Sequence, residues 1–106
     1  MAQHVLALTT VANDEDGRKL AKALVERRVA ACVNLLGGVR SFYRWKGKLE
    51  EELEQLLLIK TRADRFSDLE AAIEELHPYE VPELVALPIQ SGSAAYLGWV
   101  DEILKG

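Results

Sequence analysis

Apolar and polar residues alternate along this chain in a pattern that predicts a βαββαβ order followed by one more helix. Helices are expected at residues 14–28, from Phe66 to about His77, and after Ser93. Several of the expected strands carry apolar side chains on both parities, as strands buried on both faces do. The strands are expected at 5–11, at 29–36 resuming at 39–45 after Gly37-Gly38, along a return arm ending near 61, and at 84–89.

Local signals mark the ends of the helices. Asn13 and Ser93 stand just before helical periodicity begins, where their side chains can accept from the first free N–H groups. Pro78 disfavours helical geometry at the residue before it, so the middle helix must stop near His77. This end is the best-defined boundary in the chain.

The strand pair from 30 to 61, folded back at Trp45-Lys46-Gly47-Lys48, is too long for the rest of the domain. Arms of about 15 residues at ~3.3 Å each would reach ~50 Å, whereas a domain of about 100 residues has a radius of gyration near 13 Å. Part of the hairpin must therefore overhang, with Phe42, Tyr43 and Trp45 near its tip. Open strand edges and exposed aromatic side chains both favour contact with another chain, so the hairpin predicts an oligomer.

The predicted order is that of an α+β, ferredoxin-like sandwich, with an extra C-terminal helix, formed by residues 1–106 as a single domain. The length of 106 residues and the 49% hydrophobic content suit one compact core. Helices cover only one face of such a sheet, yet the strands carry apolar residues on both parities. The second face is therefore expected to be buried by partner chains.

Charge and composition exclude several classes of partner. The formal net charge of −4 offers no basic field to a phosphate backbone, so nucleic acid is not expected. No stretch reaches the ~18 apolar residues of a membrane span, and residues 1–9 lack the basic flank and apolar run of a signal peptide. Cys32 is the only cysteine, which excludes a disulfide within the chain and favours a reducing, cytoplasmic location.

Chemistries that this fold order can carry leave no mark in the sequence. One cysteine cannot hold an iron–sulfur cluster, and the loop after the first strand lacks the paired Cys-x-x-Cys of a copper chaperone. The return arm offers leucines rather than the aromatic side chains of an RNA-binding sheet. No set of acid, base and nucleophile emerges, so no enzyme is expected.

Three features have both a structural and a functional interpretation. Cys32 is a small apolar side chain on a strand, or a metal or redox site. His77 caps the carbonyls of the preceding helix, or acts as a ligand or proton site within the connector His77-Pro78-Tyr79-Glu80-Val81-Pro82-Glu83. Lys60 follows four apolar residues, so it leaves the sheet for solvent or meets a carboxylate such as Glu54 of another chain.

Four motifs, in order, resemble the CutA divalent-cation tolerance family. They are Ala30-Ala31-Cys32-Val33-Asn34, Tyr43-Arg44-Trp45-Lys46-Gly47, Leu58-Ile59-Lys60-Thr61 and the connector 77–83. With the βαββαβ pattern and the Tyr96-Leu97-x-Trp99 ending, the resemblance covers nearly the whole chain. Each motif alone is weak, whereas four of them in the family's order and spacing are highly specific.

The resemblance implies a homotrimer whose long hairpins pair with neighbouring subunits, an architecture shared with PII-type signalling proteins. The family is associated with tolerance of copper and other divalent cations and has no established catalytic activity. By motif, the resemblance implies an intersubunit cleft with Cys32, Trp45, Glu54, Lys60, Tyr79 and nearby His77 around it. Family members with thiolate metal sites have further cysteines that this chain lacks. Any copper site is thus expected to use His, carboxylate or residues from several chains.

These residues support three hypotheses. The first is a trimeric, non-enzymatic protein of metal-ion response that binds copper or another divalent cation weakly through His77, Glu80 and Cys32. No other cofactor is expected. The second is a PII-like sensor that binds a small anionic metabolite in the intersubunit cleft through Lys60 and Trp45. The third is a structural module that presents its trimer to a partner protein.

Overall fold

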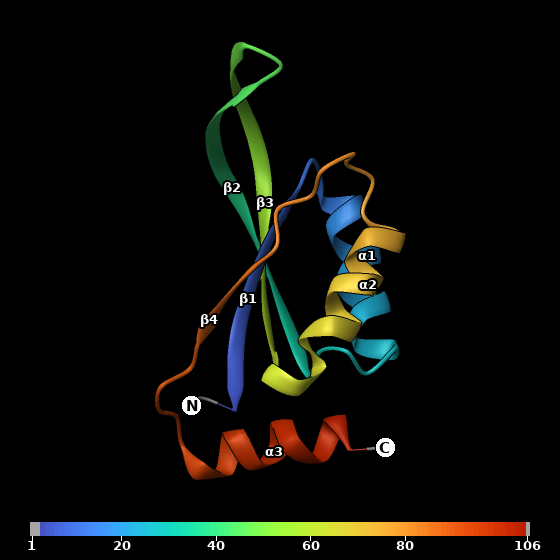
Figure 1. The fold of residues 1–106 in the computed structure, drawn as a ribbon, viewed down its shortest axis with the longest axis vertical. Coiled ribbons are helices and arrows are strands. Elements are labelled where there is room, and N and C mark those ends of the chain that lie inside the picture. The colour runs from blue at the N-terminus through green and yellow to red at the C-terminus, as the bar shows by residue number, and fades with distance from the viewer. Residues whose placement is uncertain (1–2, 106) are drawn as a thin grey trace.

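The computed structural model describes residues 3–105 as a four-stranded sheet with helices on one side and a last helix across its end (Figure 1). The α+β class, the order of the elements and the extra C-terminal helix agree with the prediction. The single domain of residues 1–106 stays a prediction, since Met1, Ala2 and Gly106 lie outside the described residues. The elements are β1 (His4–Val11), α1 (Asp14–Glu26), β2 (Cys32–Trp45), β3 (Lys48–Arg62), a 3-10 turn (Ala63–Arg65), α2 (Phe66–Leu76), β4 (Val85–Pro88) and α3 (Ala94–Leu104).

The sheet has the strand order β2-β3-β1-β4, and all neighbouring strands are antiparallel. One face lies under α1 and α2, and the core between them is apolar. Its fully buried side chains include Ala7 and Val11 of β1, Leu57 and Ile59 of β3, Leu24 of α1, and Leu69 and Ile73 of α2. Within residues 3–105, no helix is both long and apolar enough to cross a membrane.

The opposite face of the sheet carries the alternate side chains of the same strands, and α1 and α2 do not cover it (Figure 1). Because side chains alternate along a strand and paired residues share a face, the pairing identifies this surface. Leu36 of β2 is 53% exposed there. We call this surface the open face; its apolar residues are Leu6, Leu8, Leu36, Leu56, Leu58, Val85 and Leu87.

The β2–β3 hairpin extends beyond the rest of the sheet, as predicted. Pairing of β1 with β3 stops at Val11 and Gln55, whereas β2 and β3 stay paired up to Trp45 and Lys48. The molecule measures 44 Å along its long axis, and its radius of gyration is 14.3 Å; a compact chain of this length has about 13 Å. Lys46 and Gly47 turn the chain with φ of 50° and 81°, the two positive angles of a type I′ hairpin.

Gly37 and Gly38 form a bulge inside a continuous strand. Leu36 pairs with Leu56 and Val39 with Glu54, so β2 has one residue more than β3 across this step. Gly38 has a φ of 77°, which a residue without a Cβ adopts freely. The extra residue shifts the parity of β2, so Tyr43 and Trp45 share a face with Glu54 beyond the bulge.

The predicted helix caps are confirmed, and one helix end is corrected. Asn13 Oδ1 accepts from the N–H of Asp16 at 2.8 Å, and Ser93 Oγ accepts from the N–H of Tyr96 at 3.2 Å. The middle helix ends at Leu76 with His77 as its C-cap, as predicted. The first helix was expected to reach residue 28 but ends at Glu26.

A Schellman motif causes this early end. Arg28 adopts a left-handed φ of 57°, its N–H donates to the carbonyl of Val25, and the N–H of Val29 donates to the carbonyl of Leu24. Leu24 and Val29 are both buried, which gives the motif its usual apolar contact. The strand expected from residue 29 consequently begins only at Cys32.

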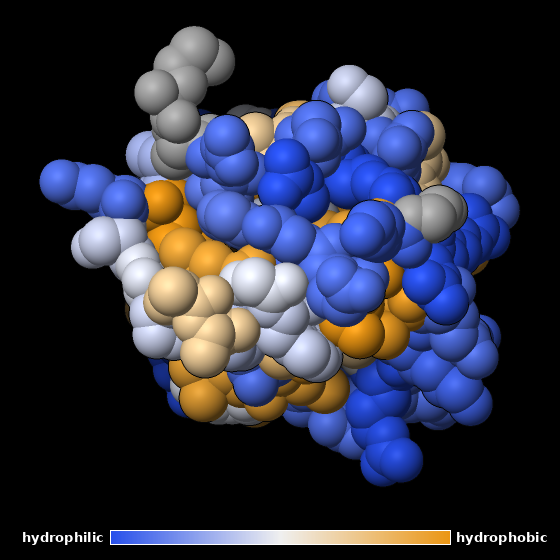
Figure 2. All heavy atoms as spheres, turned by 90° about the horizontal axis from the view of Figure 1, so that it is seen from below, coloured by the Kyte–Doolittle hydropathy of each residue, from blue (hydrophilic) through white to orange (hydrophobic). Residues whose placement is uncertain are grey.

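The last helix, α3, is held across the end of the sheet by apolar and polar contacts. Val100 and Leu104 are buried with Ala31, and apolar side chains show in patches among hydrophilic ones at this end of the molecule (Figure 2). Arg65 donates to the carbonyl of Leu104, and Arg28 donates to the carbonyl of Lys105 at 3.4 Å. Cations at a helix C-terminus are stabilised by the helix dipole, so the guanidinium groups fix this end of α3.

Candidate functional site

A cleft of about 650 Å³ lies between the overhanging hairpin and the connector that joins α2 to β4. Small-molecule sites in proteins occupy about 300–1,000 Å³, so the cleft has the size of a ligand site. Aromatic and acidic residues dominate its lining. The lining residues are Thr10, Ser41, Phe42, Tyr43, Trp45, Glu54, Tyr79, Glu80, Val81 and Glu83.

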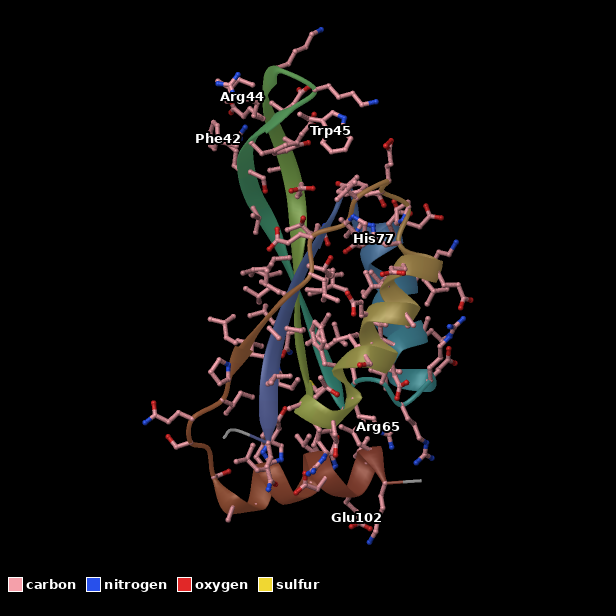
Figure 3. All side chains as sticks on the ribbon, viewed as in Figure 1. Phe42, Arg44, Trp45, Arg65, His77 and Glu102 are labelled. Atoms are coloured by element: carbon pink, nitrogen blue, oxygen red, sulfur yellow. The ribbon has the colours of Figure 1, made fainter. Side chains whose placement is uncertain are left out.

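One wall of the cleft is the hairpin beyond the bulge. Tyr43 and Trp45 lie on the same side of β2 because side chains alternate along the strand. Figure 3 shows Trp45 on the side of the hairpin nearer to His77 and Phe42 on the opposite side. The ammonium of Lys46 lies 5.7 Å from the centroid of the Trp45 ring, which is within the range of a cation–π contact.

His77 fastens the other wall to the sheet. Its side chain is buried, with 7% exposure, and its Nε2 lies 2.7 Å from the carbonyl oxygen of Thr10. Its Nδ1 accepts from the N–H of Tyr79 at 3.1 Å, so Nε2 is the nitrogen that carries the proton and donates to Thr10. Both ring nitrogens are therefore used within the chain.

The interpretation that this imidazole caps its own helix is wrong, because the carbonyl that it binds belongs to β1. The end of α2 is closed instead by the backbone N–H of His77, which donates to the carbonyl of Ile73 at 2.9 Å. The side chain thereby positions the connector at the edge of the cleft.

Glu54 is the buried acid of the cleft. It is 5% exposed, and its Oε2 accepts from the hydroxyl of Tyr79 at 2.6 Å. Burial and, after it, the hydrogen bond and charge of Glu54 raise the pKa of the Tyr79 phenol above its ordinary value. Partial burial, followed by the charges of Glu52, Glu54 and Glu50, also raises the pKa of Tyr43. Both phenols therefore keep their protons in a region of negative potential.

Of the seven predicted site residues, the structure brings four to the lining of this cleft, puts His77 behind the connector at its edge and leaves two elsewhere. Trp45, Glu54, Tyr79 and Glu80 line it. Cys32 and Lys60 pair with each other across β2 and β3, beside Leu6 of β1. The contact of His77 with Thr10 lies four residues farther along β1, or about 13 Å.

Lys60 does not extend into solvent as a solvated strand end. It is half-buried and donates to Asn34 Oδ1. Its predicted contact with Glu54 of another chain stays a prediction. The thiol of Cys32 lies 3.9 Å from the same Asn34 oxygen. Cys32, Asn34 and Lys60 thus form a small polar cluster on the open face, far from the aromatic tip.

The described residues of one chain do not form a metal centre. Among residues 3–105, no group of three or more His, Cys, Asp or Glu side chains is placed to hold an ion. The predicted ligands Cys32, His77 and Glu80 are not brought together, and a metal on His77 would displace one of its hydrogen bonds. The residues of a single chain therefore do not fit the predicted copper site, which stays a prediction for the assembled protein.

Sequence reasoning missed Thr10 and Ser41 as lining residues of the cleft. The signal for Ser41 was the alternation of side chains along β2, which puts Ser41 on the same side as Tyr43 and Trp45, while the bulge at Gly37-Gly38 gives that side the same face as Glu54. Thr10 offered no signal, because its place in the cleft depends on how the connector crosses β1.

Comparison with known proteins gives one family for nearly the whole chain. The family model described as CutA1 divalent ion tolerance protein matches residues 5–103. A Thermus thermophilus protein named divalent-cation tolerance protein CutA is 50% identical over 97 residues, 92% of this chain and 94% of that protein. Human protein CutA is 43% identical over 99 residues, 93% of this chain but 55% of the human protein. The chain thus spans nearly all of the bacterial relative and about half of the human one.

Solved structures agree with these sequence matches. The divalent cation tolerance protein from Thermus thermophilus has a TM-score of 0.90 and 49% identity, covering 93% of this chain and 96% of that chain. CutA from Xylella fastidiosa has a TM-score of 0.94 and 35% identity, covering 98% of this chain and 100% of that chain.

Proposed function

From the premise that this chain belongs to the CutA1 divalent ion tolerance family, we propose that it is a homotrimeric, non-enzymatic protein of the response to divalent metal ions. The observation that carries the proposal is the family match over residues 5–103. The family is described by tolerance of divalent ions and not by a reaction, which supports a non-enzymatic role. Its one free cysteine supports a cytoplasmic location.

The proposed architecture is the ferredoxin-like sandwich that the sequence predicts. Its support is the strand order β2-β3-β1-β4 in a βαββαβ chain, with α1 and α2 on one face of the sheet. The open face of such a sheet is free to pack against other subunits. The long overhanging hairpin supports the same assembly, since its outer strand β2 has an unpaired edge within the chain.

Two apolar surfaces favour self-association. The first is the open face, with Leu36 at its edge strand. The second is the side of the overhang that carries Leu49, Leu53 and the exposed ring of Phe42, a residue that also contributes to the lining of the cleft; Leu49 is 72% exposed. Burying a whole side chain of this kind contributes about 1.5–3 kcal/mol. Six are about half-exposed on the two surfaces, so burying them contributes roughly 5–9 kcal/mol per chain; they are Leu36, Phe42, Leu49, Leu53, Val85 and Leu87. That gain favours association, and part of it offsets the freedom that the subunits lose when they associate.

Sedimentation velocity on the full chain tests the assembly. The wild type should sediment as a trimer, and Leu36→Glu and Leu53→Glu should each shift it toward the monomer. Val25→Glu is the matched control, because Val25 is also exposed but lies on α1, away from both surfaces. A wild type that stays monomeric at micromolar concentration would overturn the proposed assembly.

We propose that copper or another divalent cation binds weakly and between chains. Support comes from the donors themselves: no three of them converge within one chain, whereas several chains can combine Cys32, His77 and Glu80 from different subunits. Calorimetric titration of Cu(II) into wild type, His77→Ala and Cys32→Ser tests the donors one by one. Equal affinities for wild type and His77→Ala would exclude His77 as a ligand.

The PII-like alternative gains no support from the geometry of one chain. Trp45 is at the tip of the hairpin and Lys60 is at its base, so they do not share a cleft. The carboxylates around Trp45 would also repel an anionic metabolite.

A further inference from the structure

We propose that the cleft between the hairpin and the connector binds an aliphatic amine that carries two or more ammonium groups. This inference concerns an organic cation and goes beyond the response to metal ions proposed above. It rests on the charge of the cleft, on its aromatic walls and on the spacing of its acids.

The charge of the cleft is one-sided. Glu54, Glu80 and Glu83 line it, and none of its described lining residues is Lys or Arg. Glu54 is buried, with an exposure of 5%. It takes part in none of the ion pairs found among residues 3–105. The hydroxyl of Tyr79 donates to one carboxylate oxygen of Glu54, but no cation among the described residues pairs with this acid, so a cation that enters the cleft gains a ready partner.

The walls of the cleft suit an organic cation. Tyr43 and Trp45 on the hairpin and Tyr79 on the connector offer three aromatic rings. Ammonium groups are attracted to the faces of such rings at distances up to about 6 Å, and methylene groups pack on them. Lys46, which is not among the lining residues, holds its ammonium 5.7 Å from the centroid of the Trp45 ring, so this ring already attracts an alkylammonium.

The spacing of the acids distinguishes a polyamine from a metal ion. A divalent metal requires donors that converge within about 2.0–2.6 Å of one point. The acids of the cleft come from β3 and from two positions of the connector, and no three of them are placed to hold an ion. An amine with several charges separated by methylene groups can pair with acids that lie apart. Free polyamines fit this better than a lysine side chain, which has a single ammonium.

Isothermal titration of the triamine spermidine into the full chain tests the proposal. Glu54→Gln removes the charge but keeps an oxygen that can accept from Tyr79, so the cleft should stay intact. We expect this variant to bind about tenfold more weakly or worse, as loss of a charge-assisted contact does. Trp45→Leu, at the exposed tip, should weaken binding severalfold. Glu102→Gln, on α3 at the far end of the molecule (Figure 3), is the matched control and should bind as the wild type does.

Butylamine and an α-acetylated lysine amide each carry a single ammonium, so they distinguish a free polyamine from a lysine side chain as the ligand. Both should bind at least about tenfold more weakly than spermidine. Equal binding of these single-charge amines would overturn the requirement for several ammonium groups. The site would be excluded if spermidine did not bind at millimolar concentration, or if Glu102→Gln weakened binding as much as Glu54→Gln. Neither result would affect the sedimentation or copper experiments, which test the proposed function separately.

Discussion

Replacing His77 by alanine should destabilise the fold by about 3 kcal/mol, because the imidazole donates one hydrogen bond to the Thr10 carbonyl of β1 and accepts another from the Tyr79 N–H within the connector. Each bond contributes a net 0.5–1.5 kcal/mol, and a buried carbonyl left without a partner costs about 1–3 kcal/mol. The carbonyl of Thr10 would be left without a partner, since its contact with the imidazole of His77 is buried. For a domain of about this size, 1 kcal/mol lowers the melting temperature by roughly 4 °C, so the expected drop is about 12 °C.

Two further variants divide the effect between the bonds. The amide nitrogen of His77→Gln can take the place of Nε2 and donate to Thr10, whereas the amide of His77→Asn reaches only the position of Nδ1 near Tyr79. We expect His77→Gln to recover more than half of the stability that His77→Ala loses, and His77→Asn to recover less than half. The reason is that the hydrogen bond to the buried Thr10 carbonyl is the costlier of the two to lose.

Urea denaturation followed by circular dichroism measures these differences, at one fixed protein concentration because association adds to apparent stability. Glu102→Gln is the control and should stay within about 0.5 kcal/mol of wild type. A loss below about 1 kcal/mol for His77→Ala would refute the view that this side chain fastens the connector.

Three other predictions concern the core, the helices and acid stability. Gly98→Ala on α3 should stabilise the protein by about 0.5–1 kcal/mol, since a Cβ there meets nothing within 4 Å. Gly17→Ala should destabilise it by about 1 kcal/mol, since the new Cβ would lie 2.8 Å from Leu35 Cδ1. Urea midpoints in the opposite order would contradict this packing. Thr9→Val should stabilise by about 1 kcal/mol, because the buried Thr9 hydroxyl has no partner among residues 3–105, and a lower melting temperature would disprove this. The pKa of Asp101 is lowered by His4 and then by Arg62, so its contribution is present above its unfolded pKa and is lost as pH falls through its folded pKa. The difference in unfolding free energy between wild type and Asp101→Asn should therefore shrink in acid. An equal difference at neutral and strongly acidic pH would refute a stabilising role of the Asp101 carboxylate.

The fold was readable from the sequence where the signals were local. Asn13, Ser93 and Pro78 mark helix ends through contacts or restrictions within a few residues, and each of these ends was found as expected. The overhang also followed from strand length alone. The end of α1 was missed because Arg28, not glycine, takes the left-handed position that closes a Schellman motif.

The site was less predictable because its contacts are long-range. The pairing of Glu54 with Tyr79, and of His77 with the carbonyl of Thr10, joins residues far apart in the chain. Tyr79 and Glu80 were selected by their place in a motif, and they do line the cleft with Trp45 and Glu54. Cys32 and Lys60 were placed in the same set, yet strand register puts them at the other end of the hairpin.

The bulge at Gly37-Gly38 separates the length of β2 from its register with β3. Leu36 pairs with Leu56 and Val39 with Glu54, so between these pairs β2 carries one residue that β3 does not match. If one of these glycines were deleted, the ladder would close without a bulge, and Val39 and Tyr43 would still lie opposite Glu54 and Glu50. Both sides of the overhang would keep their side chains, and only the local bend and twist that a bulge gives a strand would be lost. Relatives of this chain can therefore differ by one residue at this point of β2 while the acidic, aromatic side of the hairpin stays the same.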